Sequence, residues 1–392
     1  MPAINCGGVV RDSMFVEKTS SGVKLLRPAF LLGVLALFLF GGVVRAQTIK
    51  DMPPPPDMRL KPKPTPPPKP PSEEVLDVVK VTSNLVMVPV SVTNNAGQAV
   101  QGLQVADFRL LEEGKEQQIA EIGDPEQVPL DIAVLFDISS SVSQKGFFAF
   151  QQNAAATFLR EVMKPVDKAA IFTIADRPVM VQSLASAQDA AAKMVSIQAA
   201  TSSVPTAFYD TVSAAASYLT ANSPSRHRRV IVVISDGDDN FSETIKASSI
   251  AEARANLNGQ QTPASALVSL LEKHRRAVAE VQQNVLKADA AFYSVNPGGP
   301  SVRLNQISLR AQNSMETIAD ASGGTAFLPD SDKDLEQVFR IVAAELRGQY
   351  LLQYYANSEV PANTFRRIQV STPAHQEYRI RARQGFYPKK AQ

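Results

Sequence analysis

Cysteine, tryptophan and histidine are scarce in this sequence. Its 392 residues include one cysteine, no tryptophan and three histidines. A single cysteine excludes a disulfide framework within the chain, so stability must come from packing or from bound metal. The histidines, His227, His274 and His375, show no metal-ligand spacing. We therefore expect them at the surface, and we expect neither a histidine metal centre nor a histidine general base.

A strong excess of charge of either sign is also missing. The chain has 40 Lys and Arg against 38 Asp and Glu, for a formal net charge of +2. This balance argues against nucleic acid as the main partner. No Gly-x-Ser-x-Gly elbow, Walker loop or dinucleotide-binding fingerprint is present. The length predicts two domains with accessory segments, and the 44% hydrophobic content is sufficient for a sizeable core.

The first 74 residues have the composition of a targeting segment followed by a spacer. Residues 1–46 combine Lys24 and Arg27 with an apolar run over residues 28–44, which predicts a signal peptide. An uncleaved membrane anchor is the alternative, because roughly 17 apolar residues is the lower limit for a membrane span. Residues 47–74 are rich in proline and predict an extended linker. We expect an exported protein that is periplasmic, in the cell envelope or secreted, with a possible membrane tether.

Two patterns follow the linker. Short apolar alternations in residues 75–127, and again in residues 349–388, predict antiparallel strands, and we expect the late strands to complete the early sheet. Residues 128–348 alternate strands and helices, with a helical insertion at about residues 243–289. This alternation predicts an α/β fold with a doubly wound, mainly parallel sheet flanked by helices. The early and late strands are expected to form a small β-sandwich-like domain around it.

The expected elements of the α/β part can be given by residue number. The predicted strands are 130–137, 169–175, 179–183, 229–235, 291–296 and 325–328. The predicted helices are 147–163, 187–197, 207–219, 315–321 and 332–346.

An Asp-x-Ser-x-Ser sequence stands at the end of the first of these strands. It supplies the carboxylate of Asp137 and the hydroxyls of Ser139 and Ser141. Thr206 and Asp236 are further oxygen donors, placed where a helix begins and a strand ends. Ligands of open parallel sheets bind beyond the carboxyl ends of the strands. Since oxygen ligands suit a hard divalent cation, these five residues predict a site for Mg²⁺, or for Mn²⁺ or Ca²⁺.

Other interpretations apply to parts of this pattern. Ser139 to Ser141 taken alone would be read as a cap of the following helix. Asp238 and Asp239 stand at the rim of the site, either as a solvated acidic turn or as added charge near the ion. An EF-hand is excluded, because Phe241 stands where that loop needs glycine.

Two groups of arginines are expected at the surface. Arg226, Arg228 and Arg229 come directly before or at the start of a buried strand, which predicts a solvated strand end, with a site for an anionic partner as the alternative. Arg379, Arg381 and Arg383 alternate along one late strand, which predicts an exposed strand face.

Asp137-x-Ser139-x-Ser141, Thr206 and Asp236 resemble the metal-ion-dependent adhesion site of von Willebrand factor type A domains. The resemblance covers roughly residues 130–348, and the flanking segments 107–114 and 350–355 look like the bacterial VWFA-related proteins of acidobacterial genomes. It implies direct coordination by Ser139 and Ser141, direct or water-mediated binding by Thr206, and water-mediated action of Asp137 and Asp236.

The same resemblance implies that the open coordination position takes a carboxylate from a partner protein. The family often has Gly-Gly-Thr where this chain has Ser203-Val204-Pro205-Thr206, and Pro205 stiffens that loop. The expected function is an exported, metal-dependent protein-binding module without enzymatic activity. The alternatives are an envelope scaffold with a vestigial metal site and a metal-dependent hydrolase, which would need a general base near the ion.

Overall fold

The computed structural model describes residues 85–139, 148–246, 254, 257, 262–300, 306–356, 361 and 364–388. The predicted targeting segment, the linker and Ser141 lie outside the described residues. The described residues belong to one compact unit. None of the helices described in it combines the length and the apolar composition needed to cross a membrane.

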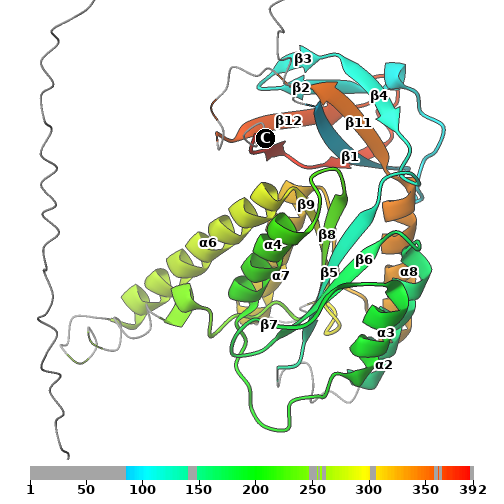
Figure 1. Ribbon diagram of the computed structural model, residues 1–392. Coiled ribbons are helices and arrows are strands. Elements are labelled where there is room, and N and C mark those ends of the chain that lie inside the picture. Colours follow the sequence, from blue (N-terminus) through cyan, green and yellow to red (C-terminus); the bar gives the residue numbers. More distant parts are fainter. Residues whose placement is uncertain are drawn as a thin grey trace, which may run out of the picture. The chain divides into compact units, whose positions relative to one another are not determined.

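A six-stranded sheet forms the centre of the α/β domain (Figure 1). Its strand order is β10-β9-β8-β5-β6-β7. All neighbouring pairs are parallel except β6 and β7, which are antiparallel. The strands are β5 (Leu130–Asp137), β6 (Lys168–Ile174), β7 (Val179–Ala185), β8 (Arg228–Ile234), β9 (Ala290–Val295) and β10 (Ala326–Phe327).

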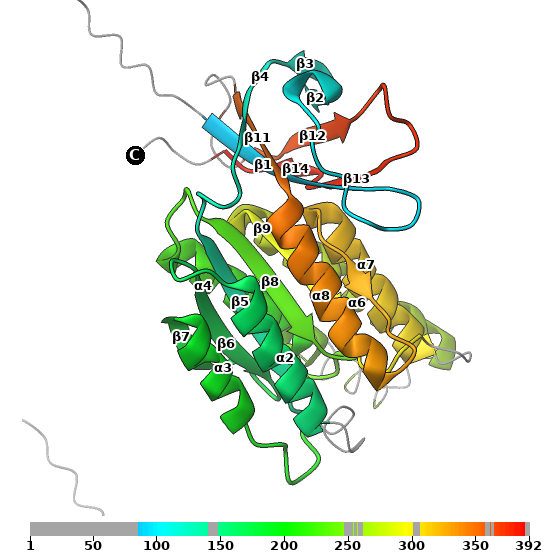
Figure 2. The same cartoon turned by 90° about the vertical axis from the view of Figure 1, so that its right-hand side faces the viewer.

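Helices cover both faces of this sheet (Figures 1 and 2). One face packs against α2 (Phe148–Val162), α3 (Ala187–Ser196) and α8 (Asp332–Gly348). The other face packs against α4 (Phe208–Asn222), α6 (Pro263–Ala288) and α7 (Gln306–Ser322). Strands β5 and β8 are buried along their whole length, which explains their nearly continuous apolar sequences. The predicted doubly wound fold is confirmed, while α7 begins earlier than the predicted helix 315–321.

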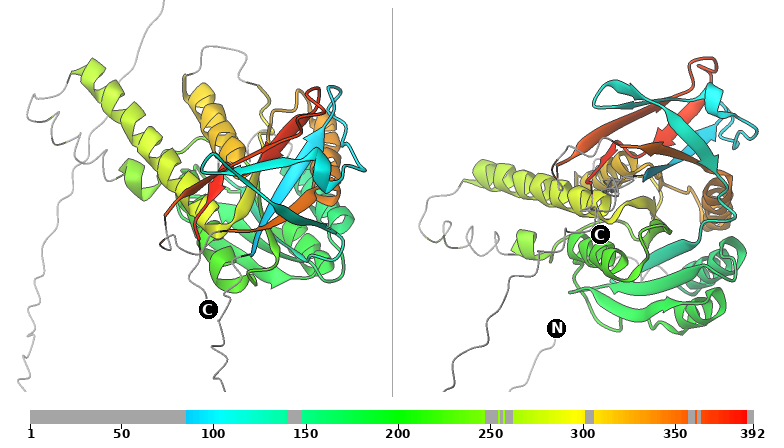
Figure 3. Two further views of the ribbon diagram at one scale, coloured as in Figure 1. Left: turned by 90° about the horizontal axis from the view of Figure 1, so that it is seen from above. Right: turned by 45° about the horizontal axis from the view of Figure 1, so that its top comes forward.

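Helix α6 is the longest element of the insertion. Figure 3 shows it extending past the neighbouring helices in both views. Its first turns expose the apolar side chains of Leu267, Val268 and Leu271. Its C-terminal half is buried against α4 and the sheet through Ala277, Val281 and Val285, among others.

Strands from before and after the α/β domain pair with each other in two further sheets. One sheet has the order β13-β1-β11-β4 and the other β14-β12-β2-β3. Their inner faces share one apolar core, as expected for a small β-sandwich-like domain. The early strands are β1 (Leu85–Thr93), β2 (Arg109–Glu112), β3 (Lys115–Gln117) and β4 (Ile119–Gly123), and a short 3-10 helix, η1 (Val105–Asp107), lies between β1 and β2. The late strands are β11 (Tyr350–Tyr355), β12 (Arg366–Ser371), β13 (Arg379–Ala382) and β14 (Gly385–Phe386).

Arg228 and Arg229 are buried, with 6% and 4% of their surface exposed, so the predicted solvated strand end is wrong for them. Their guanidinium groups donate to backbone carbonyls at the ends of helices. Arg228 Nη1 donates to Leu346 O in α8, and Arg229 donates to Ala288 O, the last residue of α6, and to Ser223 O, just after α4. The last carbonyls of a helix have no partner within it, and a buried cation satisfies both their hydrogen bonding and the helix dipole.

The expected exposure of the arginine face near the C-terminus is also wrong. Arg379 is exposed, whereas Arg381 is half-buried and Arg383 is buried. Arg381 pairs with Glu345 of α8, and Arg383 pairs with Asp289, the residue that ends α6. Because both partners belong to the α/β domain, the segment from Arg381 to Arg383 at the end of β13 is an internal contact between the β-sandwich and the α/β domain.

Candidate functional site

The predicted site residues follow the two central strands of the sheet. After β5 the chain passes to β6 on one side, while β8 lies on the other side of β5. This reversal of strand order is the topological switch point, where open α/β sheets bind ligands. Asp137 is the last residue of β5, and Ser235 and Asp236 directly follow β8. Residues about a hundred positions apart in the sequence therefore meet at one edge of the sheet.

Asp137 is fully buried and both of its oxygens accept hydrogen bonds. Oδ1 accepts the backbone N–H of Ser139 at 2.8 Å, and Oδ2 accepts the hydroxyl of Ser235 at 2.5 Å. Ser235 Oγ in turn accepts the N–H of Gly237 at 3.0 Å. Ser235 was missed by sequence reasoning, although a small hydroxyl residue directly before Asp236 was a usable signal. It fixes the end of β8 to the carboxylate of Asp137.

The electrostatic environment of Asp137 favours a bound cation. Burial, and to a smaller extent the nearby charge of Asp236, raise the pKa of Asp137 to about 6, while the hydrogen bonds from Ser139 and Ser235 oppose the shift. A buried carboxylate beside a second carboxylate is costly when both are ionised. A divalent cation would remove that cost, so the donor set fits a metal ion electrostatically.

Thr206 is held against the loop that follows Asp236. It is 4% exposed, and its N–H donates to Asn240 Oδ1 at 2.9 Å. Its carbonyl accepts the N–H groups of Asn240 and Phe241 at 3.1 and 3.0 Å. On the other side, the N–H of Ala207 donates to Ala175 O at the end of β6. Thr206 is thus joined to both neighbouring segments, and the role of Asn240 was not predicted from the sequence.

The two rim aspartates have different surroundings. Asp239 is 2% exposed and accepts the N–H of Tyr209 in the first turn of α4 at 2.8 Å, so the interpretation as a solvated acidic turn is wrong for it. Its other oxygen accepts the N–H of Ser242 at 2.9 Å. Asp238 is partly exposed and pairs with Arg310 of α7 at 3.4 Å. Burial and Asp236 raise the pKa of Asp238, and Arg310 opposes that shift.

Gly237 is needed where the chain turns away from Asp236. Its φ of +75° lies in the left-handed region, and a Cβ added there would lie 2.7 Å from Cε of Met315. A larger residue would strain the backbone at this φ and would have to displace the side chain of Met315. Glycine therefore lets the loop after β8 bend close to α7, with the side chains of Ser235 and Asp236 at the edge of the sheet.

His274 contradicts the expected surface position of the histidines. It is 3% exposed, and its Nδ1 lies 3.1 Å from the hydroxyl of Tyr209. Burial lowers the pKa of His274 to about 4, with smaller contributions from the positive charges of Arg310 and Lys273. A neutral, buried imidazole at this position stabilises the contact between α6 and α4.

The structure thus brings Asp137, Ser139 and the Ser235–Asp236 segment together and joins Thr206 to the loop beyond them. Ser141 lies outside the described residues. Within the described ranges, no group of three or more His, Cys, Asp or Glu side chains is arranged to hold a metal ion. The predicted ligand set differs from such a group, because it combines two carboxylates with serine and threonine hydroxyls.

Residues 131–294 match the family model of the von Willebrand factor type A domain. None of the curated proteins matches the sequence. Among solved structures, a von Willebrand factor type A protein from Catenulispora acidiphila is 16% identical, with a TM-score of 0.40, over 68% of this chain and 51% of that one. Proximal thread matrix protein 1 from the mussel byssus, described with a zinc-occupied MIDAS motif, is 15% identical, with a TM-score of 0.37, over 60% of this chain and 49% of that one. BatB from Bacteroides thetaiotaomicron is 13% identical, with a TM-score of 0.35, over 55% of this chain and 97% of that one. The chain spans about half the length of the first two of these structures.

Proposed function

Because residues 131–294 form a von Willebrand factor type A domain, we propose that this protein is a metal-dependent protein-binding module. In this proposal, Asp137, Ser139, Ser141, Thr206 and Asp236 hold one divalent cation, and these residues are called the predicted cation site below. The open coordination position of the ion takes a carboxylate from a partner protein. An exported protein of the cell envelope, periplasm or extracellular space is the setting that the N-terminal sequence favours.

The observation that carries the proposal is the buried carboxylate of Asp137 at the switch point of the sheet. It is fully buried, lies close enough to Asp236 for their charges to repel, and has its pKa raised to about 6. Folding a carboxylate into such a place costs free energy unless an opposite charge is bound there. The site is therefore suited to a cation more than to an anion or a neutral ligand.

The hydrogen bonds of Asp137 support an indirect role for it at the ion. Each of its oxygens already accepts a bond from Ser139 or Ser235. A carboxylate used in this way orients neighbouring hydroxyls and holds water, and it leaves direct coordination to Ser139, Ser141 and Thr206. Few anionic ligands in direct contact would leave the ion with a strong attraction for an external carboxylate.

We propose Mg²⁺ as the ion, with Mn²⁺ and Ca²⁺ as alternatives. Hydroxyl, carboxylate and water oxygens are the ligands that these hard cations prefer.

A binding role is preferred over hydrolysis, because the histidines occupy structural positions. His227 pairs with Asp131 near the start of β5, at the opposite end of that strand from Asp137. His274 is buried against Tyr209, and His375 follows β12 in the β-sandwich. A metal-dependent hydrolase needs a general base near the ion.

Calorimetric titration with Mg²⁺ or Mn²⁺ tests the proposal. Wild type should bind one ion, and Asp137→Asn should bind at least about tenfold more weakly, since it loses a full charge beside the ion. Asp131→Asn is the matched control, because it removes a buried carboxylate from the other end of the same strand and should leave the affinity unchanged. Equal binding by Asp137→Asn and wild type would refute the site.

A second measurement separates protein binding from a scaffold with a vestigial site. A resin carrying a glutamate-containing peptide should retain the protein in Mg²⁺ and release it in EDTA, and the same peptide with glutamine should not retain it. Metal binding without any retention of the acidic peptide would favour the scaffold.

A further inference from the structure

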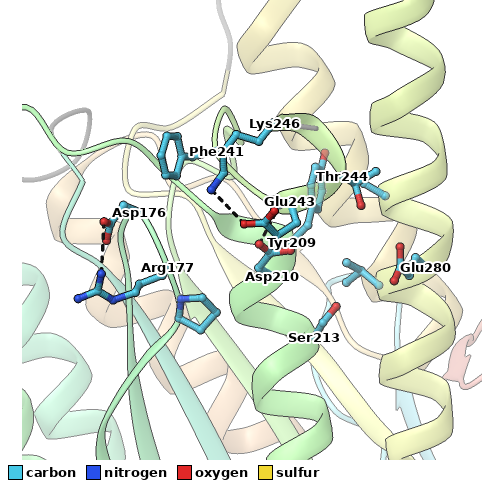
Figure 4. A pocket seen from close by; sticks show the side chains of 13 residues that line it. Asp176, Arg177, Tyr209, Asp210, Ser213, Phe241, Glu243, Thr244, Lys246 and Glu280 are labelled. Atoms are coloured by element: carbon cyan, nitrogen blue, oxygen red, sulfur yellow. Dashed lines mark hydrogen bonds and ion pairs between the residues drawn. The ribbon is translucent and has the colours of Figure 1, made fainter. Parts of the chain in front are cut away.

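A groove of about 580 Å³ opens between α4 and α6 (Figure 4). Its remaining walls are the turn between β6 and β7, which includes Asp176 and Arg177, and the segment 241–246. Tyr209, Ala277 and Val281 are buried residues that line it, so its floor is apolar and aromatic. We call this space the α4–α6 groove.

The α4–α6 groove shares a wall with the predicted cation site. Tyr209 and Asp210, in the first turn of α4, line the groove, and Thr206 lies just before that helix. Phe241, another lining residue, donates its backbone N–H to the carbonyl of Thr206. The groove and the predicted cation site are therefore joined through the segment 206–210 and the loop that contains Phe241.

The charges that line the groove do not balance. Arg177 pairs with Asp176 at 3.8 Å, and Lys246 pairs with Glu243 at 3.0 Å. These two pairs cancel.

Asp210 and Glu280 remain. Asp210 accepts the backbone N–H of Glu243 at 2.9 Å, and neither carboxylate has a cationic partner among the residues that the structure describes. Figure 4 shows Asp210 on α4 and Glu280 on the neighbouring α6, on the side of the groove away from the Asp176–Arg177 pair. The groove therefore presents two uncompensated negative charges above an apolar floor.

The groove already holds a cation within the chain. The ammonium group of Lys246 lies 4.2 Å from the centre of the Phe241 ring while it bonds to Glu243. This is the combination that recognises a basic side chain: an aromatic face, a carboxylate and an apolar surface for the methylene groups. Asp210 and Glu280 offer two further carboxylates beside the apolar floor of the groove.

We propose that the α4–α6 groove binds an arginine or lysine side chain of the partner protein, beside the acidic residue that docks at the predicted cation site. The partner would then carry an acidic and a basic residue a few positions apart on one surface. That this basic side chain belongs to the partner protein rests on the proposed function. The preference of the groove for a positively charged group does not, since it follows from Asp210 and Glu280.

The test uses the full chain in EDTA, so that the predicted cation site takes no part in it. The probe is Nα-acetyl-arginine amide, and its neutral isostere Nα-acetyl-citrulline amide is the control. Binding is followed by saturation-transfer NMR. We expect the arginine compound to bind and the citrulline compound to bind at least about fivefold more weakly, the effect of losing one exposed ion pair of about 1 kcal/mol.

Variants assign the binding to the groove. Glu280→Gln should weaken binding of the arginine compound about fivefold. Glu272→Gln is the matched control, because Glu272 lies on the same helix and pairs with Arg275 and Arg276 outside the groove. Asp210→Asn is a second test, and thermal melting checks that its helix still forms.

Equal binding of the two compounds, or no effect of Glu280→Gln, would overturn the proposal. Tighter binding of putrescine than of the arginine compound would also overturn it, because a free diamine would then be the better occupant. The NMR test is carried out without metal, so its failure would not affect the calorimetric test of the predicted cation site. A failure of the calorimetric test would likewise leave the NMR test of the groove valid.

Discussion

Replacing Asp137 with asparagine should raise the stability of the metal-free protein at pH 7, although the replaced residue lies at the centre of the predicted cation site. Asp137 is fully buried and its pKa is raised to about 6, which means that its charged form is disfavoured in the folded state. An asparagine keeps the shape and removes the charge. The repulsion from Asp236 disappears with it.

The magnitude follows from the pKa. A shift from 3.8 to about 6 is about two units, or about 3 kcal/mol of native-state penalty at pH 7. The penalty is absent below the unfolded-state pKa and complete above the folded-state pKa. The contribution of Asp137 therefore lowers the free energy of unfolding of wild type as the pH rises from about 4 to above 6. Asparagine offers an NH₂ group where Ser235 donates its hydroxyl, which costs about 1–2 kcal/mol. The net gain is about 1–2 kcal/mol, or a few degrees in Tm.

Saturating Mg²⁺ should reverse this difference, so that wild type becomes more stable than the Asp137→Asn variant. Binding at a hundredfold excess over Kd stabilises wild type by about 2.7 kcal/mol, and the asparagine variant receives much less. The assay is denaturant unfolding of both proteins in EDTA and in Mg²⁺, between pH 4 and pH 7. If the variant is the less stable protein in EDTA at pH 7, or if the difference between the two does not change with pH, then the charge of Asp137 carries no penalty and the reasoning fails.

Three further substitutions test the fold of the α/β domain. His274 contributes a loss of stability of roughly 3 kcal/mol as the pH falls from about 6.5 to 4, because burial lowers its folded-state pKa to about 4, opposite in sign to the contribution of Asp137. His274→Gln should remove this contribution, so the difference in unfolding free energy between variant and wild type should change by that amount over this range; identical pH profiles in urea unfolding would contradict this. Arg229→Met should lower the free energy of unfolding by about 2–5 kcal/mol, since two buried carbonyls lose their donor, whereas Arg226→Met at an exposed position should change it by less than about 0.5 kcal/mol; equal effects of the pair would refute the role assigned to Arg229. Gly324→Ala would place a Cβ 1.9 Å from the carbonyl oxygen of Phe292 and should cost about 3 kcal/mol or more in thermal unfolding, and an unchanged Tm would show that β9 yields easily.

The strands of the sheet could be predicted because burial on both faces leaves a continuous apolar signal. The predicted strand 130–137 coincides with β5, and β8 begins one residue before the predicted start. The placement of Asp137 and Asp236 at one edge followed from that, since parallel neighbours end at the same edge of a sheet. These parts of the fold depend on local sequence patterns and on a general rule of topology.

The buried charges could not be predicted in the same way. Arg228, Arg229 and Arg383 are buried because tertiary structure brings carbonyls or a carboxylate to them from helices or strands that are distant in the sequence. Sequence alone shows the charge of an arginine and its neighbours, and these suggest solvent. His274 is a similar case, since its partner Tyr209 stands 65 positions earlier in the chain.

The β-sandwich also has a consequence for the order in which the chain can fold. Strand β1 pairs on one side with β11 and on the other with β13, so both of its neighbours come after the whole α/β domain. A growing or emerging chain exposes the unpaired edges of β1 until the last strands are available. The α/β domain can close its own sheet earlier, because β5 to β10 are contiguous in the sequence. Folding of the sandwich therefore follows completion of the α/β domain. A protease cut between α8 and β11 would remove both partners of β1 while leaving the sheet that carries Asp137 and Asp236 intact.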